Sequence, residues 1–420
     1  MSHDPVEHIR GLQQLLISDK KRIAFLFGAG TSLAKKNSES RCVPAIGELT
    51  EDITNNLCSV PKYDQAVNEI KSEMGKGMFN IETFLSNMQQ KYEIIGGGTL
   101  NGLNHKEFEE LIQCVKSEIR ERVSVHKEIL KEDEKLNNLI HVNFAEWIGR
   151  ADRKYPIEIF TTNYDYLLEL GLEKKRIPYY DGFTGSYEPF FDSNSVNNLD
   201  FLPKQTKLWK LHGSLGWQLD IASQKVLRKD SDHTDILIYP STLKYSHSKK
   251  QPYIALMDRL SNFLKEPDTI LITCGYSFGD DHINERILSA LDSRNSGHVI
   301  GLFYDKLPKE DSYSLTEDSS VCKMAQSNGK ISIYGCGSAV IGCQFGKWNL
   351  KVQPDKDDPI NVVQFFDMRA PFDPNAPLNT ELKGGGWTGE GDLILPDFSK
   401  FVFFLKSMVS ANPLAGESKI

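Results

Sequence analysis

Short apolar runs alternate with helical repeats through much of this chain, and that alternation restricts the fold more than any other feature. The run Arg22–Phe27 (RIAFLF) is almost continuously apolar, as expected of a strand buried on both faces. Because strands that alternate with helices form βαβ units, we predict an α/β fold with a Rossmann-like parallel sheet flanked by helices. Further strands are predicted over 156–165, 206–214, 235–241, 269–277 and 298–305, and helices over 6–19, 166–175, 253–264 and 280–292.

Two regions lack this alternation. From about residue 46 to 150 apolar residues recur at helical spacing, which predicts a helical insertion. Asn80 is the predicted N-cap of one helix in this insertion, and residues 93–105 are predicted to form a flexible loop. After residue 305 the pattern loosens, and segment 372–392 is rich in Pro and Gly. The predicted division is a sheet domain over 1–305 and an appended region over 306–420 that serves packing or assembly.

Composition narrows the class of protein. The 420 residues carry a formal charge of −8, which argues against sequence-specific nucleic-acid binding, and no apolar run approaches the roughly 20 residues that span a bilayer. The N-terminus has no signal-peptide core. Seven scattered cysteines without a C-x-x-C pair favour reduced thiols and no metal site. We therefore expect a cytoplasmic protein without a membrane span.

Small and polar residues follow four of the predicted strands. Each group alone has an ordinary explanation as a turn or a helix cap. However, the carboxyl ends of parallel strands meet at one edge of a sheet, so all four groups should border a single crevice. The four groups are Gly28-Ala29-Gly30-Thr31-Ser32, Thr161-Thr162-Asn163-Tyr164-Asp165, His212-Gly213-Ser214, and Gly275-Tyr276-Ser277 with Asp280, Asp281 and Asn284 close behind.

The order of these groups resembles the sirtuin-like superfamily, whose motifs are G-A-G-x-S, T-Q-N-x-D, H-G and G-T/Y-S. The corresponding stretches read GAGTS, TTNYD, LHGS and CGYSFGDDHIN, and the resemblance covers roughly residues 20–305. It implies an NAD-binding catalytic domain with NAD as the substrate. In such a turn two glycines let backbone amides approach the pyrophosphate. Leu33, where a third glycine would complete a dinucleotide fingerprint, is then expected to pack the following helix.

The resemblance also implies roles for individual residues. His212 would accept a proton, and Asn163 would hold water or ribose hydroxyls. Asp165 would orient loops or counter positive charge, although a role as a helix N-cap explains this residue equally well. Tyr276 is read as packing, and capping is the preferred reading of Asp281. The residues implied in NAD binding are Gly28, Ala29, Gly30, Thr31, Ser32, Thr162, Gly213, Gly275, Ser277 and Asn284.

Departures from the sirtuin pattern point to a subgroup. The four-cysteine zinc module of the deacylases is missing, and Thr162 stands where they have Gln. The chain therefore looks like the zinc-free bacterial sirtuin-like NADases of anti-phage defence, and is similar to the subunit that pairs with a HerA-type ATPase. This implies an NAD glycohydrolase that forms nicotinamide and ADP-ribose in abortive infection, is held in a homo-oligomer or partner assembly, and needs no metal.

Two alternatives stay open at this level. An NAD-dependent protein deacylase would need an acyl-lysine channel and normally zinc. A catalytically silent subunit that binds NAD or ADP-ribose and scaffolds an ATPase would not need both Asn163 and His212, which this sequence retains.

Overall fold

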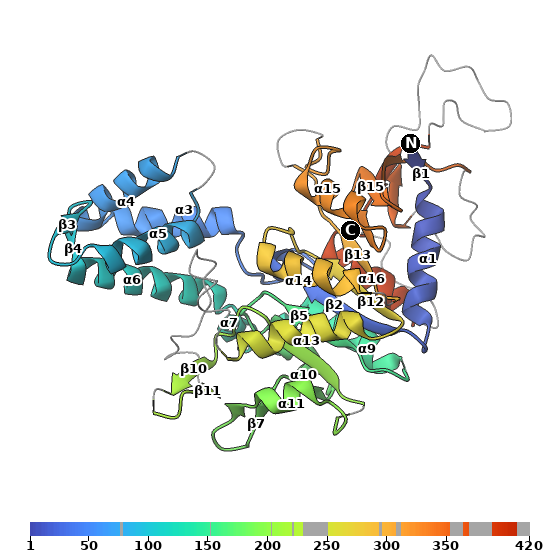
Figure 1. Cartoon of the computed structure of the whole chain (residues 1–420), viewed down its shortest axis with the longest axis horizontal. Coiled ribbons are helices and arrows are strands. Elements are labelled where there is room, and N and C mark those ends of the chain that lie inside the picture. The colour runs from blue at the N-terminus through green and yellow to red at the C-terminus, as the bar shows by residue number, and fades with distance from the viewer. Residues whose placement is uncertain are drawn as a thin grey trace, which may run out of the picture.

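A ten-stranded mixed sheet forms the centre of the computed structural model, and helices cover both of its faces (Figure 1). The structure describes residues 1–75, 79–151, 153–202, 204–220, 222–229, 251–293, 296–307, 312–352, 364–368 and 389–409. The strand order is β1-β16-β15-β14-β13-β12-β2-β5-β9-β6. The strands are β1 (Ser2–His3), β2 (Arg22–Phe27), β5 (Glu158–Thr161), β6 (Tyr179–Tyr180), β9 (Thr206–Lys210), β12 (Thr269–Cys274), β13 (His298–Leu302), β14 (Ile331–Tyr334), β15 (Ser338–Ile341) and β16 (Gln344–Trp348).

The part of the sheet from β14 to β6 is parallel throughout, whereas β15 runs antiparallel to both of its neighbours. The predicted α/β fold with a parallel sheet flanked by helices is therefore confirmed. Five of the six predicted strands are present, and β2 has the predicted bounds. The sixth, over 235–241, lies outside the described residues.

Two hydrophobic cores lie on opposite faces of the sheet. Within β2, Ile23, Phe25 and Phe27 belong to one core and Ala24 and Leu26 to the other. This period of two explains why a strand buried on both faces has a continuous apolar sequence. The first core is covered by α1 (Pro5–Ile17), α9 (Ile140–Arg150), α10 (Leu167–Lys174) and α16 (Phe398–Ser407), and the second by α11 (Ser193–Asn197), α13 (Tyr253–Lys265), α14 (Asp281–Asp292) and α15 (Ser320–Ser327).

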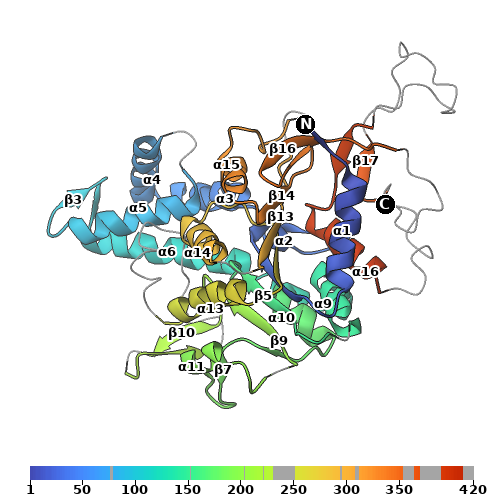
Figure 2. The same ribbon diagram turned by 45° about the vertical axis from the view of Figure 1, so that its right-hand side comes forward.

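A group of helices projects from one side of the sheet and has a core of its own (Figures 1 and 2). It contains α3 (Ile46–Cys58), α4 (Pro61–Met74), α5 (Ile81–Ile94), α6 (His105–Val123) and the hairpin of β3 (Thr99–Leu100) and β4 (Leu103–Asn104). Asn80 caps α5 as predicted, with its side chain accepting from the amides of Glu82 and Thr83. The predicted flexible loop is wrong over 99–104, which form the hairpin, and Asn104 then caps α6.

The chain returns from this group through α7 (His126–Ile129) and α8 (Asp133–Asn137) to α9. Although the sequence places α9 within the helical insertion, Phe144 and Trp147 of this helix pack in the core of the sheet. We call α3–α6 the helical subdomain. Its position beside the carboxyl ends of the strands is what makes it relevant to a binding site.

Two smaller sheets and the C-terminal region complete the described structure. A four-stranded sheet is formed by β7 (Phe183–Thr184), β8 (Phe190–Phe191), β10 (Trp217–Asp220) and β11 (Lys225–Arg228), and a two-stranded one by β17 (Phe366–Met368) and β18 (Gly391–Leu393). Beyond residue 305, β14, β15 and β16 extend the central sheet, and α16 packs against α9 (Figure 2). Phe401 and Val402 of α16 are fully buried.

Candidate active site

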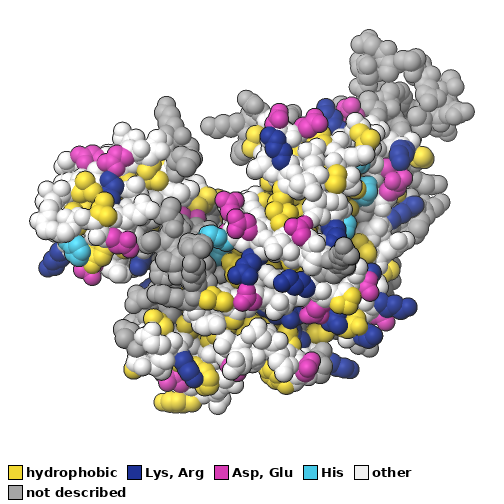
Figure 3. Space-filling model, in the orientation of Figure 1, with side chains coloured by type: hydrophobic (Ala, Val, Ile, Leu, Met, Phe, Trp, Pro, Cys, Tyr) yellow, Lys and Arg dark blue, Asp and Glu magenta, His cyan; other side chains and the backbone are white. Residues whose placement is uncertain are grey.

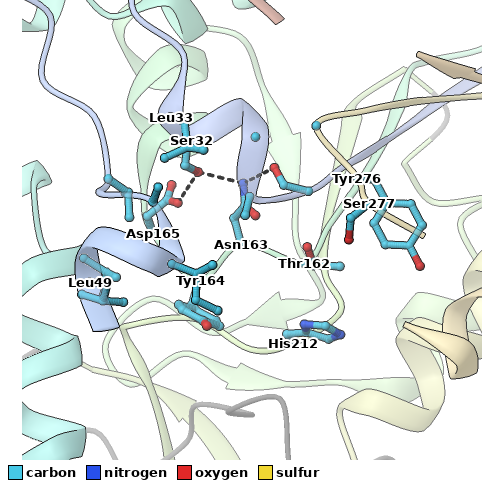
Figure 4. A pocket seen from close by; sticks show the side chains of 18 of the residues that line it. Ser32, Leu33, Leu49, Thr162, Asn163, Tyr164, Asp165, His212, Tyr276 and Ser277 are labelled. Carbon is cyan, nitrogen blue, oxygen red and sulfur yellow. Dashed lines mark hydrogen bonds between the residues drawn. The ribbon is translucent and has the colours of Figure 1, made fainter. Parts of the chain in front are cut away.

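A cavity of about 500 Å³ lies between the carboxyl ends of four neighbouring parallel strands and the helical subdomain (Figure 4). The four strands, β12, β2, β5 and β9, are adjacent in the sheet, so the four polar groups of the sequence meet as expected. The cavity is lined on the sheet side by Gly28, Ala29, Gly30, Ser32, Thr162, Asn163, Tyr164, Asp165, His212, Gly275, Tyr276, Ser277, Gly279 and Asp280, and opposite them by Leu33, Val43, Pro44, Ala45, Ile46, Leu49, Glu82 and Val123.

Ten of the thirteen residues implicated by sequence line this cavity, and Thr31, Gly213 and Asn284 do not. Thr31 is fully buried, and its hydroxyl donates to the Gly28 carbonyl at 2.9 Å. Gly213 has φ of +94°, a left-handed conformation that suits glycine and turns the chain directly after His212. Asn284 lies beneath the cavity wall, where its amide donates to the Phe278 carbonyl at 2.7 Å. These three residues shape the walls of the cavity.

The two glycines of the first turn are required by a close approach of two strand ends. A Cβ atom on Gly28 would lie 2.4 Å from the carbonyl oxygen of Gly275, and one on Gly30 would lie 2.7 Å from the Gly275 Cα. Gly275 itself has φ of +63°, and its Cβ would lie 2.5 Å from the Thr31 nitrogen. Any side chain at these positions would push the ends of β2 and β12 apart.

The backbone amides of the same glycines differ from the sequence-based expectation. The Gly28 N–H donates to the Cys274 carbonyl at 3.1 Å, and the Gly30 N–H donates to the Gly275 carbonyl at 3.0 Å. These two amides therefore join the ends of β2 and β12, whereas the sequence suggested that they face a pyrophosphate. The turn leads into α2 (Ala29–Leu33), and Leu33 is 37% exposed and lines the cavity, so the prediction that it packs the following helix is wrong.

Asn163 connects the loop after β5 to the turn after β2 (Figure 4). Its Nδ2 lies 3.0 Å from the Gly28 carbonyl, 3.0 Å from Thr31 Oγ1 and 2.7 Å from Ser32 Oγ, so its two N–H groups are shared among three acceptors. The side chain is 8% exposed. Asn163 thus holds the first turn in place, and its Oδ1 is the polar atom that it can offer to the cavity.

Asp165 is held by two contacts that fix both of its carboxylate oxygens. Oδ2 accepts from the Ser32 hydroxyl at 2.5 Å, and Oδ1 accepts from the Leu167 N–H at the start of α10 at 3.0 Å. Asp165 therefore bonds the first amide of α10, although the N-cap residue of that helix is Tyr166, and it also joins the loop after β5 to the first turn. Asp165 also lines the cavity, near the first turn.

A buried ion pair supports the loops that carry Asn163 and His212. Lys210 Nζ donates to Glu169 Oε1 at 2.6 Å, to Ser214 Oγ at 3.1 Å and to the carbonyl of Asp165. The side chains of Lys210 and Glu169 are 4% and 12% exposed. Burial raises the pKa of Glu169 above its usual value, and the ammonium of Lys210 opposes that rise. One cation therefore joins the loops after β5 and β9.

His212 forms a pair with Asp280, which the sequence analysis did not assign a role. His212 Nε2 lies 3.0 Å from Asp280 Oδ2, and each residue is 7% exposed. Asp280 Oδ1 accepts from the amides of His282 and Ile283, so Asp280 rather than Asp281 is the N-cap of α14. The helix N-terminus favours the ionised carboxylate. A fixed carboxylate at Nε2 favours the tautomer with hydrogen on that nitrogen.

Tyr276 has a larger role than packing. Its hydroxyl donates to Asn284 Oδ1 at 3.0 Å, and burial raises its pKa, so the phenol is neutral. Ser277 lines the cavity beside it, and the Ser277 hydroxyl accepts from the Gly279 N–H at 3.4 Å. This wall, made by the loop after β12, offers hydroxyl and backbone groups to a ligand.

The helical subdomain contributes residues that sequence reasoning missed. Leu49 of α3 and Val123 of α6 make its part of the wall apolar. Glu82 of α5 also lines the cavity and accepts from the Tyr164 hydroxyl at 3.2 Å, so it links the subdomain to the loop of Asn163. No local motif marks Glu82, because its role depends on the packing of α5 against the loop after β5, which lies far away in the sequence.

The charges of the cavity are unevenly distributed. Glu82, Asp165 and Asp280 line it, and no Lys or Arg of the described chain does. Within the described ranges, no three His, Cys, Asp or Glu side chains are grouped as metal ligands, and no helix is long and apolar enough to cross a membrane. On the molecular face in Figure 3, acidic and basic side chains are interspersed.

Comparison with known families identifies one match. Residues 157–322 match the family described as the SIR2-like domain. The matched segment contains Asn163, His212 and residues 275–284. It begins after the Gly28–Ser32 turn, so the position of that turn at the cavity is an observation separate from the family match. It supports a sirtuin-like superfamily and an NAD-related function. Among curated proteins, no match to this sequence is found.

Proposed function

We propose that this protein is an NAD glycohydrolase that cleaves NAD into nicotinamide and ADP-ribose. The observation that carries the proposal is the placement of Asn163 and His212 at neighbouring strand ends, both facing one cavity and both held by buried partners. The cavity volume of about 500 Å³ lies within the usual range for small-molecule sites. The SIR2-like match over 157–322 supports NAD as the substrate.

The proposed reaction needs modest help from the protein. Water attacks C1′ of the nicotinamide ribose, the C1′–N bond breaks, and its electron pair leaves with nicotinamide. His212, which Asp280 orients, accepts the proton that the water loses. Asn163 Oδ1 accepts from the water or from a ribose hydroxyl. The three carboxylates of the wall favour the positive charge that develops on the ribose.

The first turn and the loop after β12 would hold the rest of the substrate. Because the Gly28 and Gly30 amides already bond to backbone carbonyls, we assign the phosphates to the remaining groups of the Gly28–Ser32 turn that line the cavity, and the adenosine ribose to the wall that contains Ser277. The reaction would require no metal, since neither the leaving of nicotinamide nor the attack by water needs one.

The direct test is product identification. The purified chain is incubated with NAD, with and without an acetyl-lysine peptide, and the products are separated by chromatography and mass spectrometry. We expect nicotinamide and ADP-ribose at a rate independent of the peptide. Peptide-dependent formation of O-acetyl-ADP-ribose would establish the deacylase alternative. NAD binding without any product, alone or with a partner ATPase, would establish the silent scaffold.

For the cellular role we propose NAD depletion in bacterial anti-phage defence by abortive infection. A chain that destroys NAD has to be restrained, which is the reason to propose a cytoplasmic homo-oligomer or a complex with a HerA-type ATPase. Co-expression with such an ATPase, followed by co-purification and the same product assay, tests this assembly. Failure to co-purify would remove the partner without affecting the reaction.

A further inference from the structure

The two ends of the cavity differ in chemistry. Ser277 lines it on one side of Asn163, whereas Leu33 and Leu49 lie on the other side (Figure 4). The proposed reaction places the breaking bond at Asn163 and His212 and the adenosine ribose at Ser277. The part of NAD beyond that bond, the nicotinamide ring, therefore extends toward the end that contains Leu33 and Leu49.

The helical subdomain makes this end apolar and also brings a carboxylate to it. Leu49 and Val123 belong to the core of the subdomain, and Val43 and Tyr164 pack against that core. All four residues line the cavity. The Tyr164 hydroxyl donates to Glu82 Oε1 at 3.2 Å, and Glu82 lines the cavity as well. The apolar end therefore carries the carboxylate of Glu82.

A carboxylate in these surroundings suits a cationic ring. The nicotinamide ring of NAD is planar and positively charged, whereas the adenosine is neutral and the phosphates are negative. Apolar neighbours lower the local dielectric constant and so strengthen the attraction between opposite charges. Glu82 lies in the first turn of α5, where the helix N-terminus favours the ionised carboxylate. This attraction acts through space and adds to the hydrogen bond that Glu82 accepts from Tyr164.

Asp165 lies on the same side of Asn163 as Leu33, but its carboxylate serves the loops (Figure 4). One of its oxygens accepts from the Ser32 hydroxyl and the other from the Leu167 N–H. Replacing Asp165 would therefore disturb the walls of the cavity, whereas Glu82 reaches the cavity from a separate helix.

We propose that Glu82 is a specificity-determining residue that recognises the positive charge of the nicotinamide ring. The inference rests on the proposed function for the choice of NAD as the ligand. It requires the protein to prefer an oxidised nicotinamide over a reduced one, because NADH has the same carboxamide and ribose but a neutral ring. The preference should belong to Glu82 and disappear with its charge.

Three variants separate this charge from the hydrogen bond. In Glu82→Gln the amide oxygen still accepts from the Tyr164 hydroxyl, so the link to the loop after β5 is kept while the charge is lost. Tyr164→Phe does the reverse, since it removes the hydrogen bond and keeps the charge. Glu93→Gln removes the same charge from an exposed position of α5 outside the cavity and is the matched control.

The test is calorimetry of NAD, NADH and ADP-ribose binding to the full chain, with His212→Ala as the common background so that NAD is not cleaved. We expect Glu82→Gln to raise the Kd for NAD at least about fivefold. The Kd values for NADH and ADP-ribose should not rise, because losing a negative charge favours the binding of an anion. Tyr164→Phe and Glu93→Gln should both retain the preference for NAD over NADH.

The proposal is overturned if Glu82→Gln leaves the Kd for NAD unchanged or weakens all three ligands equally. It is also overturned if Tyr164→Phe abolishes the preference for NAD to the same extent, which would make Glu82 a structural link, or if NAD does not bind. NAD binding with the expected preference, but without nicotinamide release by the chain that retains His212, would refute the proposed function and leave this inference intact. Nicotinamide release with an unchanged KM in Glu82→Gln would do the opposite.

Discussion

At the scale of single residues, Asn163 joins two functions that look separate in the sequence. The motif suggests that Asn163 serves the ribose while the Gly28–Ser32 turn serves the phosphates. In the structure, however, Asn163 Nδ2 contacts three oxygens of that turn. Losing this side chain should therefore disturb substrate binding as well as chemistry.

We predict that Asn163→Ala lowers NAD turnover by about 10²-fold or more and also weakens ADP-ribose binding, because the first turn loses its support. Calorimetry with ADP-ribose and turnover with NAD should be measured on one preparation. Asn55→Ala, which changes an exposed asparagine of α3 that does not line the cavity, is the control. Unchanged ADP-ribose affinity in a folded Asn163→Ala protein would contradict the structural role.

Asp280 is a positioning residue that acts through His212. Asp280→Asn keeps a good N-cap for α14 but removes the charge that faces His212 Nε2. The fold should therefore persist, while kcat falls at least about tenfold and KM changes less. Asp281→Asn changes the adjacent residue, which does not line the cavity, and should leave kcat unchanged. Equal kcat for Asp280→Asn and wild type would remove Asp280 from the reaction.

At the scale of elements, the loops after β5 and β9 depend on the buried pair of Lys210 and Glu169. Removing one member of such a pair costs about 3–5 kcal/mol, whereas replacing both by apolar residues can be nearly neutral. We predict that Lys210→Met lowers the unfolding free energy by that order and that Lys210→Met with Glu169→Leu restores much of it. Turnover should stay low in both, because the Asp165 carbonyl and Ser214 lose their donor. Full turnover in the double variant would show that the pair serves stability alone.

His141 of α9 makes the free energy of unfolding depend on pH. The residue is 1% exposed, and burial lowers its pKa to about 4. Above pH 6.5 this histidine is neutral whether the chain is folded or unfolded. As the pH falls below 6.5 the unfolded chain takes up a proton first, so folding loses about 2 kcal/mol by pH 5. The stability difference between wild type and His141→Asn should shrink by that amount from pH 7 to pH 5 in denaturant titrations. A difference that stays constant would contradict this burial effect.

The sequence predicts elements better than the contacts among them. Apolar runs locate β2, β5, β9, β12 and β13, and strand-end motifs locate Asn163 and His212, because these signals are local. The pairing of His212 with Asp280 joins residues 68 positions apart, and Glu82 reaches the cavity from another subdomain. The role of Gly28 was also misjudged, since the backbone of Gly275 that crowds it lies far along the chain. Such contacts follow from topology and leave no local pattern.

At the scale of the whole molecule, the cavity at the strand ends is assembled from two parts of the chain. The sheet supplies nearly all of its polar groups, and the helical subdomain supplies an apolar wall with Glu82 (Figure 4). A dinucleotide bound between them would be shielded from water on the side of the reacting bond, which strengthens the electrostatic effect of the carboxylates.

The central claim is that this chain cleaves NAD through His212. The most direct measurement compares the rate of nicotinamide release from NAD by wild type and by His212→Ala, with circular dichroism and thermal unfolding as checks on folding. We predict release of nicotinamide by wild type and a loss of about 10²–10⁴-fold in the variant at unchanged fold. Nicotinamide release at the wild-type rate by a well-folded His212→Ala protein would contradict the account.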